Sequence, residues 1–382
     1  MRAILCVFLL VATAFVADTP QAHNGVVRFV FTSDAHYGLT RRTFRGQTDV
    51  SAHDVNAALV ADANTLAAEG PFDFVVEGGD VTNRAEVDEH VQAPSVSWAQ
   101  FKSDYIDHLT LRTAAGTPTP VYVVPGNHDA SNAIGFYKAM RPVLDKTPMV
   151  EIYNLMMAPA ARTTATYNYA SDRVLTSRDV GGVHFVFLTV WPDGAGRAWL
   201  ARDLEHVGAS TPVVIFTHDQ PDAQSKHFTN PNGAHDINAT DRFENLLSDT
   251  FADGKTTDVG DEIEQTAWED FVRRHPNITA YFHGNSNWNE FYVWRGPEHS
   301  VALQTFRADS PMKGRFSEAD ERRLSYHVAT IDTQTMKMTV RERLWNTSSW
   351  GGAIAVGLRP RDTAFNPQLT ASTSVRNGRP LP

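Results

Sequence analysis

The sequence has almost no cysteine and no long apolar segment beyond its first residues. The single cysteine among 382 residues is Cys6, inside the N-terminal apolar segment. If that segment is removed, the mature chain has no thiol, which excludes a cysteine nucleophile, a disulfide framework and a zinc–thiolate site. The fold must then be stabilised by its core alone, and a chain of this length can bury a large one.

The chain also lacks a surplus of positive charge. It carries 34 Lys and Arg against 44 Asp and Glu, a formal net charge of −10. A protein that binds nucleic acid or an anionic membrane needs a basic surface, so we expect neither as a partner. A small anionic ligand is still allowed, because metal ions or a few arginines reverse the charge locally.

The N-terminus has the pattern of a secretory signal peptide. Arg2 supplies a positive charge, Ala3–Val16 is apolar, and small residues within Ala12–Ala17 offer cleavage positions. About fourteen apolar residues are too few to span a bilayer, which argues against a stable membrane anchor. We therefore predict a signal peptide over residues 1–22 and a secreted or periplasmic protein.

Short apolar runs alternate with helical patterns through the rest of the chain. The runs are β-branched or aromatic and bounded by Gly, Pro, Asp or Ser, which is typical of buried strands. Their alternation with helices indicates an α/β core with largely parallel strands. Strands are predicted at Val26–Phe31, Phe72–Val76, Val121–Val124, Val183–Val190, Val213–Phe216 and Ile278–Phe282, and helices at Asp54–Glu69, Ser95–Leu109, Arg197–Val207 and Glu262–His275.

The C-terminal part of the sequence has a different character. Phe291–Trp294 and Tyr326–Trp345 have the pattern of antiparallel strands, with a turn at Asp332–Thr335. From Gly351 the sequence is rich in Gly, Pro, Ser, Thr and Arg and has little periodicity. We predict one domain over residues 23–350 and an extended or disordered tail over residues 351–382.

Polar side chains follow five of the predicted strands at the point where each ends. The five segments read FTSDAH (31–36), VVEGGDVTN (75–83), VVPGNHD (123–129), FTHD (216–219) and FHGNSN (282–287). In open α/β sheets, ligands bind beyond the carboxyl ends of the strands, so these loops are expected to converge. Carboxylates, imidazoles and amide oxygens without sulfur form a ligand set for Mn, Fe or Zn.

In this order, the motifs resemble those of the calcineurin-like metallophosphoesterase superfamily. Its pattern is D-x-H, G-D-x-x, G-N-H-D, a lone His after a strand, and G-H-x-H, and the first four blocks are present here. The resemblance implies an α/β fold, a four-layer α/β/β/α sandwich of two mixed sheets flanked by helices. It also implies a dinuclear metal site at the carboxyl ends of the strands, holding two divalent or trivalent ions, Mn or Fe, with Zn as an alternative.

The resemblance assigns a role to each motif residue. His128 would contact the substrate phosphate and protonate the leaving oxygen, with Asp129 orienting it, and Asn83 would brace the loop that carries Asp80. Two ions ~3.5–4 Å apart can clamp a phosphoryl group and hold a hydroxide for in-line attack. The implied ligands are Asp34 and His36 for the first ion, Asp80 as a bridge, and Asn127 and His218 for the second.

The fifth block departs from the family pattern. Gly284 is followed by Asn285, Ser286 and Asn287, where the family has two histidines that bind the second and first metals. Asparagine can ligate through its amide oxygen, but this oxygen is a weaker donor than imidazole. His283 is an alternative ligand if the strand continues, and a polar loop without a metal role is the other interpretation.

Two long segments between predicted elements are candidates for shaping a substrate pocket. The segment 37–53 contains Arg41, Arg42 and Arg45, which would bind phosphate, and the segment 219–261 contains His235. Arginine binds phosphate through two parallel hydrogen bonds. The alternative is that these side chains are solvated surface groups.

Together these features predict an exported hydrolase acting on a small-molecule phosphate monoester or diester through metal-held hydroxide. The substitution at Asn285 and Asn287 supports an alternative, a catalytically impaired relative that binds a phosphorylated ligand or partner. A third interpretation is an enzyme that keeps one metal ion. Retention of His128 and Asp129 favours catalysis, because a binding protein has no need of a general acid.

Overall fold

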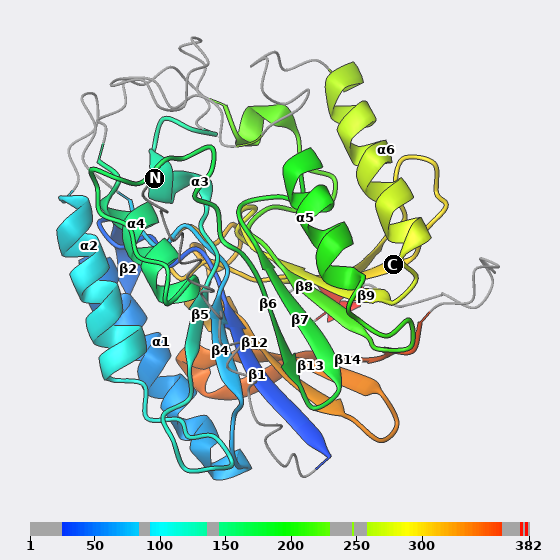
Figure 1. The fold of residues 1–382 in the computed structure, drawn as a ribbon. Coiled ribbons are helices and arrows are strands. Elements are labelled where there is room, and N and C mark those ends of the chain that lie inside the picture. The colour runs from blue at the N-terminus through cyan, green and yellow to red at the C-terminus, as the bar shows by residue number, and fades with distance from the viewer. Residues whose placement is uncertain are drawn as a thin grey trace, which may run out of the picture.

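The apolar runs of the sequence form the strands of two sheets, which lie against each other between two groups of helices (Figure 1). The structure is a computed structural model that describes residues 25–83, 92–135, 145–229, 247, 258–360, 375–376 and 379–380. The predicted signal peptide at 1–22 and His235 lie outside the described residues. Most of the segment 219–261 lies outside them as well.

The first sheet has six strands in the order β14-β13-β12-β1-β4-β5. Its parallel part carries the first three polar loops, and its antiparallel part is a meander of hairpins. The parallel strands are β1 (Val26–Thr32), β4 (Phe74–Glu77) and β5 (Val121–Val123), and the antiparallel strands are β12 (Ser325–Asp332), β13 (Lys337–Leu344) and β14 (Ser349–Gly357).

The second sheet has eight strands in the order β16-β15-β10-β11-β9-β8-β7-β6. Its central strands β11, β9, β8 and β7 are parallel, and its edges are antiparallel. The strands are β6 (Leu175–Val180), β7 (Val183–Leu188), β8 (Val213–Phe216), β9 (Ile278–His283), β10 (Glu290–Trp294), β11 (Leu303–Arg307), β15 (Val375–Arg376) and β16 (Arg379–Pro380).

Aromatic side chains fill the space between the two sheets. Phe29 of β1 stacks on Phe74 of β4 at 5.0 Å and meets Phe185, Phe216 and Phe282 of the second sheet edge-on at 5.4–5.9 Å. Burial of such rings is a major favourable term in folding, and edge-to-face pairs add to it. This layer fixes how the strand ends of one sheet face those of the other.

The helices cover the outer faces of the sheets (Figure 1). Alternation along β8 shows why: Val214 and Phe216 face the inner core, while Val213 and Ile215 pack with Trp268 of α6. The helices are α1 (Ala52–Thr65), α2 (Pro94–Phe101), α3 (Asn127–Ala130), α4 (Thr147–Met156), α5 (Gly194–Leu204) and α6 (Asp258–Arg274), with a π-helix at Lys102–Asp107 and 3₁₀ turns at Leu66–Glu69, Ser225–His227, Glu321–Arg323 and Trp345–Thr347.

The architecture confirms the predicted fold class of two mixed sheets flanked by helices, with two differences in detail. The segment 37–53, expected to be a long loop, contains the hairpin of β2 (Thr40–Phe44) and β3 (Gln47–Ser51). The domain boundary expected at residue 350 falls within β14, which pairs with β13 as far as Gly357. Gly351 conceals this strand in the sequence, yet its lack of a side chain leaves room for Glu342 of β13.

Candidate metal centre

The five polar loops predicted to converge lie together at the carboxyl ends of β1, β4, β5, β8 and β9. Main-chain hydrogen bonds tie neighbouring loops to one another: Asp34 N donates to Gly79 O at 2.9 Å, and His36 N donates to Asp80 O at 2.9 Å. Within the second sheet, Gly284 N donates to His218 O at 2.9 Å, and between the two sheets Asn285 N donates to Asp34 Oδ2 at 2.9 Å. Backbone bonds between loops position the side chains that follow them.

Two glycines of the motifs are required by close approach. A Cβ atom on Gly126 would lie 2.3 Å from Asp80 N, and one on Gly284 would lie 2.1 Å from Asp34 Oδ2. No other residue type fits at these positions without moving the loops. The glycines therefore set the distance at which the polar loops meet.

The backbone of this region is strained in a regular way. Five non-glycine residues of the motifs have φ between 44° and 61°, in the left-handed region that side chains disfavour: Asp34, His36, Asp80, Asn285 and Asn287. Such strain costs free energy and is concentrated at functional sites, where surrounding structure enforces it. The D-x-H and N-x-N segments share the same pattern of two left-handed residues separated by one.

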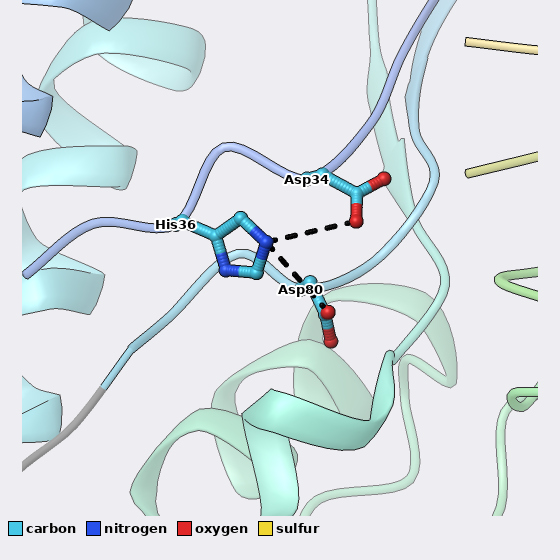
Figure 2. A group of neighbouring side chains, drawn as sticks. All are labelled: Asp34, His36 and Asp80. Carbon is cyan, nitrogen blue, oxygen red and sulfur yellow. Dashed lines mark ion pairs between the residues drawn. The ribbon is translucent and has the colours of Figure 1, made fainter. Parts of the chain in front are cut away.

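Asp34, His36 and Asp80 form a buried cluster of three metal-ligating side chains (Figure 2). His36 Nε2 lies 3.7 Å from Asp34 Oδ1 and 3.8 Å from Asp80 Oδ2, so both carboxylates point at one ring nitrogen. Donors ~2.1 Å from a single ion are roughly 3–3.5 Å apart. The cluster is slightly wider than that and needs only small shifts to hold an ion.

A second set of donors shares Asp80 with the first. His218 Nε2 lies 3.3 Å from Asp80 Oδ2 and 3.1 Å from Asn127 Oδ1. The other ring nitrogen of His218 donates to Gly78 O at 2.8 Å, which turns Nε2 inward. Asn127 Nδ2 donates to Ile134 O at 2.6 Å, so its amide oxygen faces the cluster.

The hydrogen bonding of the first set fits a metal ion. Asp34 Oδ1 and both ring nitrogens of His36 are buried and have no hydrogen-bond partner among the described residues. Buried polar atoms are rarely left without a partner, and a bound ion removes the cost. Ser33 Oγ and Asn285 N both bind Asp34 Oδ2, which leaves Oδ1 directed at the imidazole.

Burial and the charges of neighbouring side chains shift the pKa values of these groups. Burial acts to raise the pKa of Asp80, but His218 and His128 outweigh it and lower that pKa below its ordinary range. Burial acts to lower the pKa of His218, but Asp80 raises it to about 10. For His36, burial and then the charge of Lys313 lower the pKa. The Asp80 carboxylate is thus ionised and available as a ligand.

His128 lies beside the metal ligands, but Asp129 does not orient it as predicted. His128 Nε2 lies 4.0 Å from Asp80 Oδ2, and its Nδ1 lies 3.3 Å from Asn132 Oδ1. The Asp129 carboxylate instead accepts hydrogen bonds from Thr82 N and from Gly126 N. Asp129 turns this way because it caps its own short helix, so the group that orients the His128 ring is Asn132.

Asn83 links the loops that follow β1 and β4 through its main chain. Asn83 N donates to Tyr37 O at 2.7 Å, and Asn83 O accepts a bond from Ser97 Oγ at 3.2 Å. Its side-chain oxygen has no hydrogen-bond partner among the described residues. This arrangement is compatible with the bracing role expected for Asn83.

The fifth loop brings no imidazole to the cluster. The side chain of Asn285 lies near the Asp219 carboxylate and acts to lower its pKa, whereas Asn287 Oδ1 is buried without a partner among the described residues. The prediction that His283 is an alternative metal ligand is wrong. Its ring nitrogens lie 3.0 Å from Gly284 O and from Tyr292 Oη, because His283 points to the opposite face of β9 from Phe282.

Two of the three arginines of the segment 37–53, Arg41 and Arg45, contact protein groups. Arg41 is buried and donates to Pro311 O at 2.8 Å and to Ser317 O at 2.5 Å, which corrects the prediction that it binds substrate. Arg45 Nε donates to Asn346 Oδ1 at 2.7 Å on the surface. Arg42 is exposed on β2.

Sequence reasoning missed two features of the site. Lys313 follows β11 and its Nζ lies 3.3 Å from His128 Nε2. His227 Nδ1 lies 2.7 Å from Asp219 Oδ2, so a histidine–aspartate pair abuts the fifth loop. The available signal for Lys313 was a further apolar run before it, Val301–Phe306, which is followed by a polar loop like the five strands that carry the motifs.

A sequence model described as calcineurin-like phosphoesterase matches residues 27–307. A comparison with curated protein sequences found no match.

Similar solved structures include a dimetal phosphatase from Danio rerio, with 12% identity, 87% of this chain and 99% of that chain covered, and a TM-score of 0.49. They also include GAP50 of Plasmodium, described as the anchor in its inner membrane complex, with 10% identity, coverage of 91% and 92%, and a TM-score of 0.44. A calcineurin-like phosphoesterase from Bacillus subtilis has 11% identity, coverage of 87% and 91%, and a TM-score of 0.34.

Among the described residues, we found no helix that combines the length and the apolar character needed to cross a membrane.

Proposed function

Because the chain belongs to the calcineurin-like phosphoesterase family, and is thus a hydrolase of phosphate ester bonds, we propose that it cleaves a small phosphate ester at the Asp34–Asp80–His218 centre. The predicted family is confirmed by the match over residues 27–307. The ligand assignments, the substrate and the compartment are our proposals.

The position of one oxygen atom supports the proposal most directly. Asp80 Oδ2 lies 3.8 Å from His36 Nε2 on one side and 3.3 Å from His218 Nε2 on the other. A carboxylate between two imidazoles is the arrangement needed for a shared ligand of two ions. Asp34 and His36 would hold the first ion, and Asn127 and His218 the second.

Bound divalent ions would supply an activated water at neutral pH and would neutralise charge on the phosphoryl oxygens. The chain itself arranges the surroundings. Asp80 Oδ1 accepts a hydrogen bond from His128 N at 2.8 Å, which fixes the Asp80 carboxylate while its Oδ2 faces the imidazoles. The Gly78 carbonyl holds His218 in one orientation in the same way.

We assign His128 to the substrate and not to the ions. Its Nε2 is 4.0 Å from Asp80 Oδ2, and its ring stands edge-on to that of His36, with 5.2 Å between centroids. Burial and then the charge of Lys313 lower the pKa of His128 well below its ordinary value. The free imidazole is therefore neutral near pH 7, and donation to the leaving oxygen requires that the negative charge of a bound phosphate raise this pKa.

The test combines metal analysis with turnover. Purified protein reconstituted with Mn²⁺ is analysed for bound metal and assayed on an aryl phosphate monoester and on a bis-aryl phosphate diester. We expect bound metal, and turnover of at least one ester that a chelator abolishes and Mn²⁺ restores. The control is Asp203→Asn, which removes a carboxylate that binds Ser177 Oγ and His184 on β6 and β7.

The same experiment separates the second candidate, a catalytically impaired relative that binds a phosphorylated ligand. The contact of Asn285 with Asp219 supports that candidate, because it ties up a side chain at a position where the family has a ligand. Bound metal and tight phosphate binding without turnover of either ester would favour the binding protein over the enzyme.

We also propose that the protein is exported. The support is the charged and apolar pattern of Arg2 and Ala3–Val16 together with the absence of cysteine after Cys6. N-terminal sequencing of protein from the native host should give a start between about residues 15 and 23, judged from the small-residue cleavage positions. An intact Met1 on soluble cytoplasmic protein would contradict export.

A further inference from the structure

A sixth strand-end loop reaches the candidate centre in addition to the five that carry the family motifs. β11 is parallel to β9, with Arg307 paired to His283, so both strands end at the same edge of the sheet. The chain that leaves β11 runs over residues 308–317. Its position places Lys313 against His128, with 3.3 Å between Nζ and Nε2.

This loop is fixed to the metal-ligand loops at several points. Ser310 Oγ donates to Asp34 O at 2.8 Å and accepts hydrogen bonds from Lys313 N at 2.9 Å and from Met312 N at 3.1 Å. Arg315 N donates to Asn287 O at 2.7 Å. The backbone of Lys313 is thus connected through one hydroxyl to the first metal-ligand residue.

A buried arginine holds the outer side of the same loop. Arg41 donates to Pro311 O and Ser317 O, which lie on either side of Lys313. These hydrogen bonds hold the loop in place, which would not be needed for a solvated lysine on the surface. They leave the Lys313 side chain half-buried beside the His128 imidazole.

Lys313 supplies a positive charge at the edge of the site where the fifth loop lacks histidines. Asn285 and Asn287 replace histidines, and His283 is turned away, so β9 contributes only amide groups next to Asp34. The loop after β11 brings a fixed positive charge to the same edge. That charge lies beside His128, with 3.3 Å between Lys313 Nζ and His128 Nε2.

We propose that Lys313 is a substrate-binding residue whose ammonium group contacts the phosphoryl oxygens beside His128, and that the site therefore favours a phosphate monoester over a diester. This inference rests on the proposed phosphoesterase function. The polar atoms of Lys313 and His128 are 3.3 Å apart, so one phosphoryl oxygen can lie within hydrogen-bond distance of both.

The preference for a monoester follows from charge. A monoester is a dianion near neutral pH and a diester is a monoanion. The attraction of a fixed cation grows in proportion to the ligand charge, so Lys313 stabilises the bound dianion about twice as much as the monoanion. A lysine ammonium also donates up to three hydrogen bonds, and a monoester offers three non-bridging oxygens where a diester offers two.

The test uses the full chain reconstituted with Mn²⁺ and compares Lys313→Met and Lys313→Arg with the unmodified protein. We expect Lys313→Met to lower kcat/KM about 100-fold for an aryl phosphate monoester and about 10-fold for a bis-aryl diester, since a charged hydrogen bond is lost. Lys313→Arg should keep activity on the monoester within about 10-fold, because the charge remains.

A binding measurement does not depend on turnover. Calorimetric titration with inorganic phosphate should show about 10- to 100-fold weaker binding to Lys313→Met, with unchanged manganese content by elemental analysis. Lys337→Met is the matched control. Lys337 is exposed on β13 and lies opposite Asp332 of β12 in the strand register. Asp332 in turn lies opposite Val26, at the end of β1 that is remote from Asp34.

The two hypotheses fail differently. If the unmodified protein cleaves esters and Lys313→Met changes neither phosphate affinity nor the ratio of monoester to diester activity, the inference about Lys313 is wrong and the proposed function stands. If no ester is cleaved but phosphate affinity still depends on Lys313, the proposed function is wrong and the contact with phosphate stands. Loss of manganese in Lys313→Met would show that the residue acts on the metal ligands instead.

Discussion

The loop that follows β1 and the loop that follows β9 have the same backbone and different side chains. Asp34 and His36 in one, and Asn285 and Asn287 in the other, are left-handed residues separated by a single position. The loops touch, since Asn285 N donates to Asp34 Oδ2 at 2.9 Å. They lie on opposite sheets and together form two sides of one site.

Their side chains differ in whether they are already bound. In the first loop, Asp34 Oδ1 and both nitrogens of His36 have no hydrogen-bond partner among the described residues. In the second, the Asn285 side chain lies near Asp219, Asn287 Nδ2 donates to Asn285 O, and Asn287 Oδ1 is the one buried side-chain oxygen of this pair without a hydrogen-bond partner among the described residues. A strained backbone therefore marks both loops as part of a site, but the unpartnered donors identify which loop carries most of the metal binding.

The largest effect is expected from replacing Asp80, the candidate ligand that both sides of the site share. Asp80→Asn should reduce metal binding at both positions by more than about 100-fold, because loss of an outer partner alone costs 10- to 100-fold and Asp80 is a direct candidate ligand. Turnover should be lost with the metal. Elemental analysis after dialysis gives the metal content.

The control for this variant is Asp129→Asn, whose carboxylate contacts backbone amides of the neighbouring loops and not the imidazoles. Loss of one ion with retention of the other in Asp80→Asn would contradict the shared position of Asp80 Oδ2.

His128 tests whether a side chain at the same site acts without binding metal. His128→Ala should leave the metal content near normal while turnover falls by ~10²–10⁴, the range for loss of an acid–base group. Asn132→Ala should lower turnover less, because it removes only the group near His128 Nδ1. Turnover of a series of aryl phosphates is the measurement, and loss of metal from His128→Ala would make His128 a ligand.

The two asparagines sharpen the comparison further. Asn287→His should tighten Zn²⁺ binding by about 10-fold, because a neutral imidazole is a better donor than the unpartnered amide oxygen that it replaces. Asn285→His should gain less, since it loses the contact with Asp219. Calorimetry with Mn²⁺ and Zn²⁺ measures both variants, and the double variant should retain the gain of the better one.

Equal affinities in Asn287→His and the unmodified protein would place the fifth loop away from the ions. Equal gains from the two single variants would contradict the difference between the asparagines.

The smallest expected effect concerns the stability of the fold and a histidine remote from the site. Unlike His36, this histidine has a hydrogen-bond partner for each ring nitrogen. His184 has both nitrogens bound, Nδ1 to Asp179 and Nε2 to Asp203, each at 2.7 Å. Burial acts to lower the pKa of His184, but the hydrogen bonds that it donates to these carboxylates raise that pKa above its ordinary value. The stabilisation is therefore present below about pH 6.5 and is lost as pH rises through the raised pKa.

His184→Gln should lower the free energy of unfolding by about 1 kcal/mol at pH 6 and by less at pH 9. Urea unfolding at the two pH values measures the difference. His299→Gln, at an exposed position, should have little effect at either pH. An equal loss at both pH values for His184→Gln would show that the charge of His184 does not stabilise the fold.

The sequence predicted those parts of the fold and the site that depend on local patterns. The apolar runs before Asp34, Asp80 and His218 are strands, and the loops after them meet, because parallel strands place successive carboxyl ends at one edge. Local pattern did not reveal the strand at Ser349–Gly357, where glycines weaken the signal and pairing with β13 overrides it.

The parts that could not be predicted depend on contacts between distant segments. The direction of Asp129 follows from capping of its own helix, and that of His283 from the register of β9. The role of Arg41 is to hold carbonyl groups more than 260 positions away, which no local pattern encodes. Lys313 reaches His128 for the same reason, across a separation of 185.

The hydrogen bond from Asn285 N to Asp34 joins residues 251 positions apart, and the bond from Ser310 Oγ to Asp34 O spans 276. Contacts of such separation form late, because the chain must first close a very long loop. During synthesis, Asp34 and Asp80 leave the ribosome long before the segments that close over them. Metal uptake should therefore follow completion of the chain, and a chain exported unfolded would collect its ions only in the compartment where it folds.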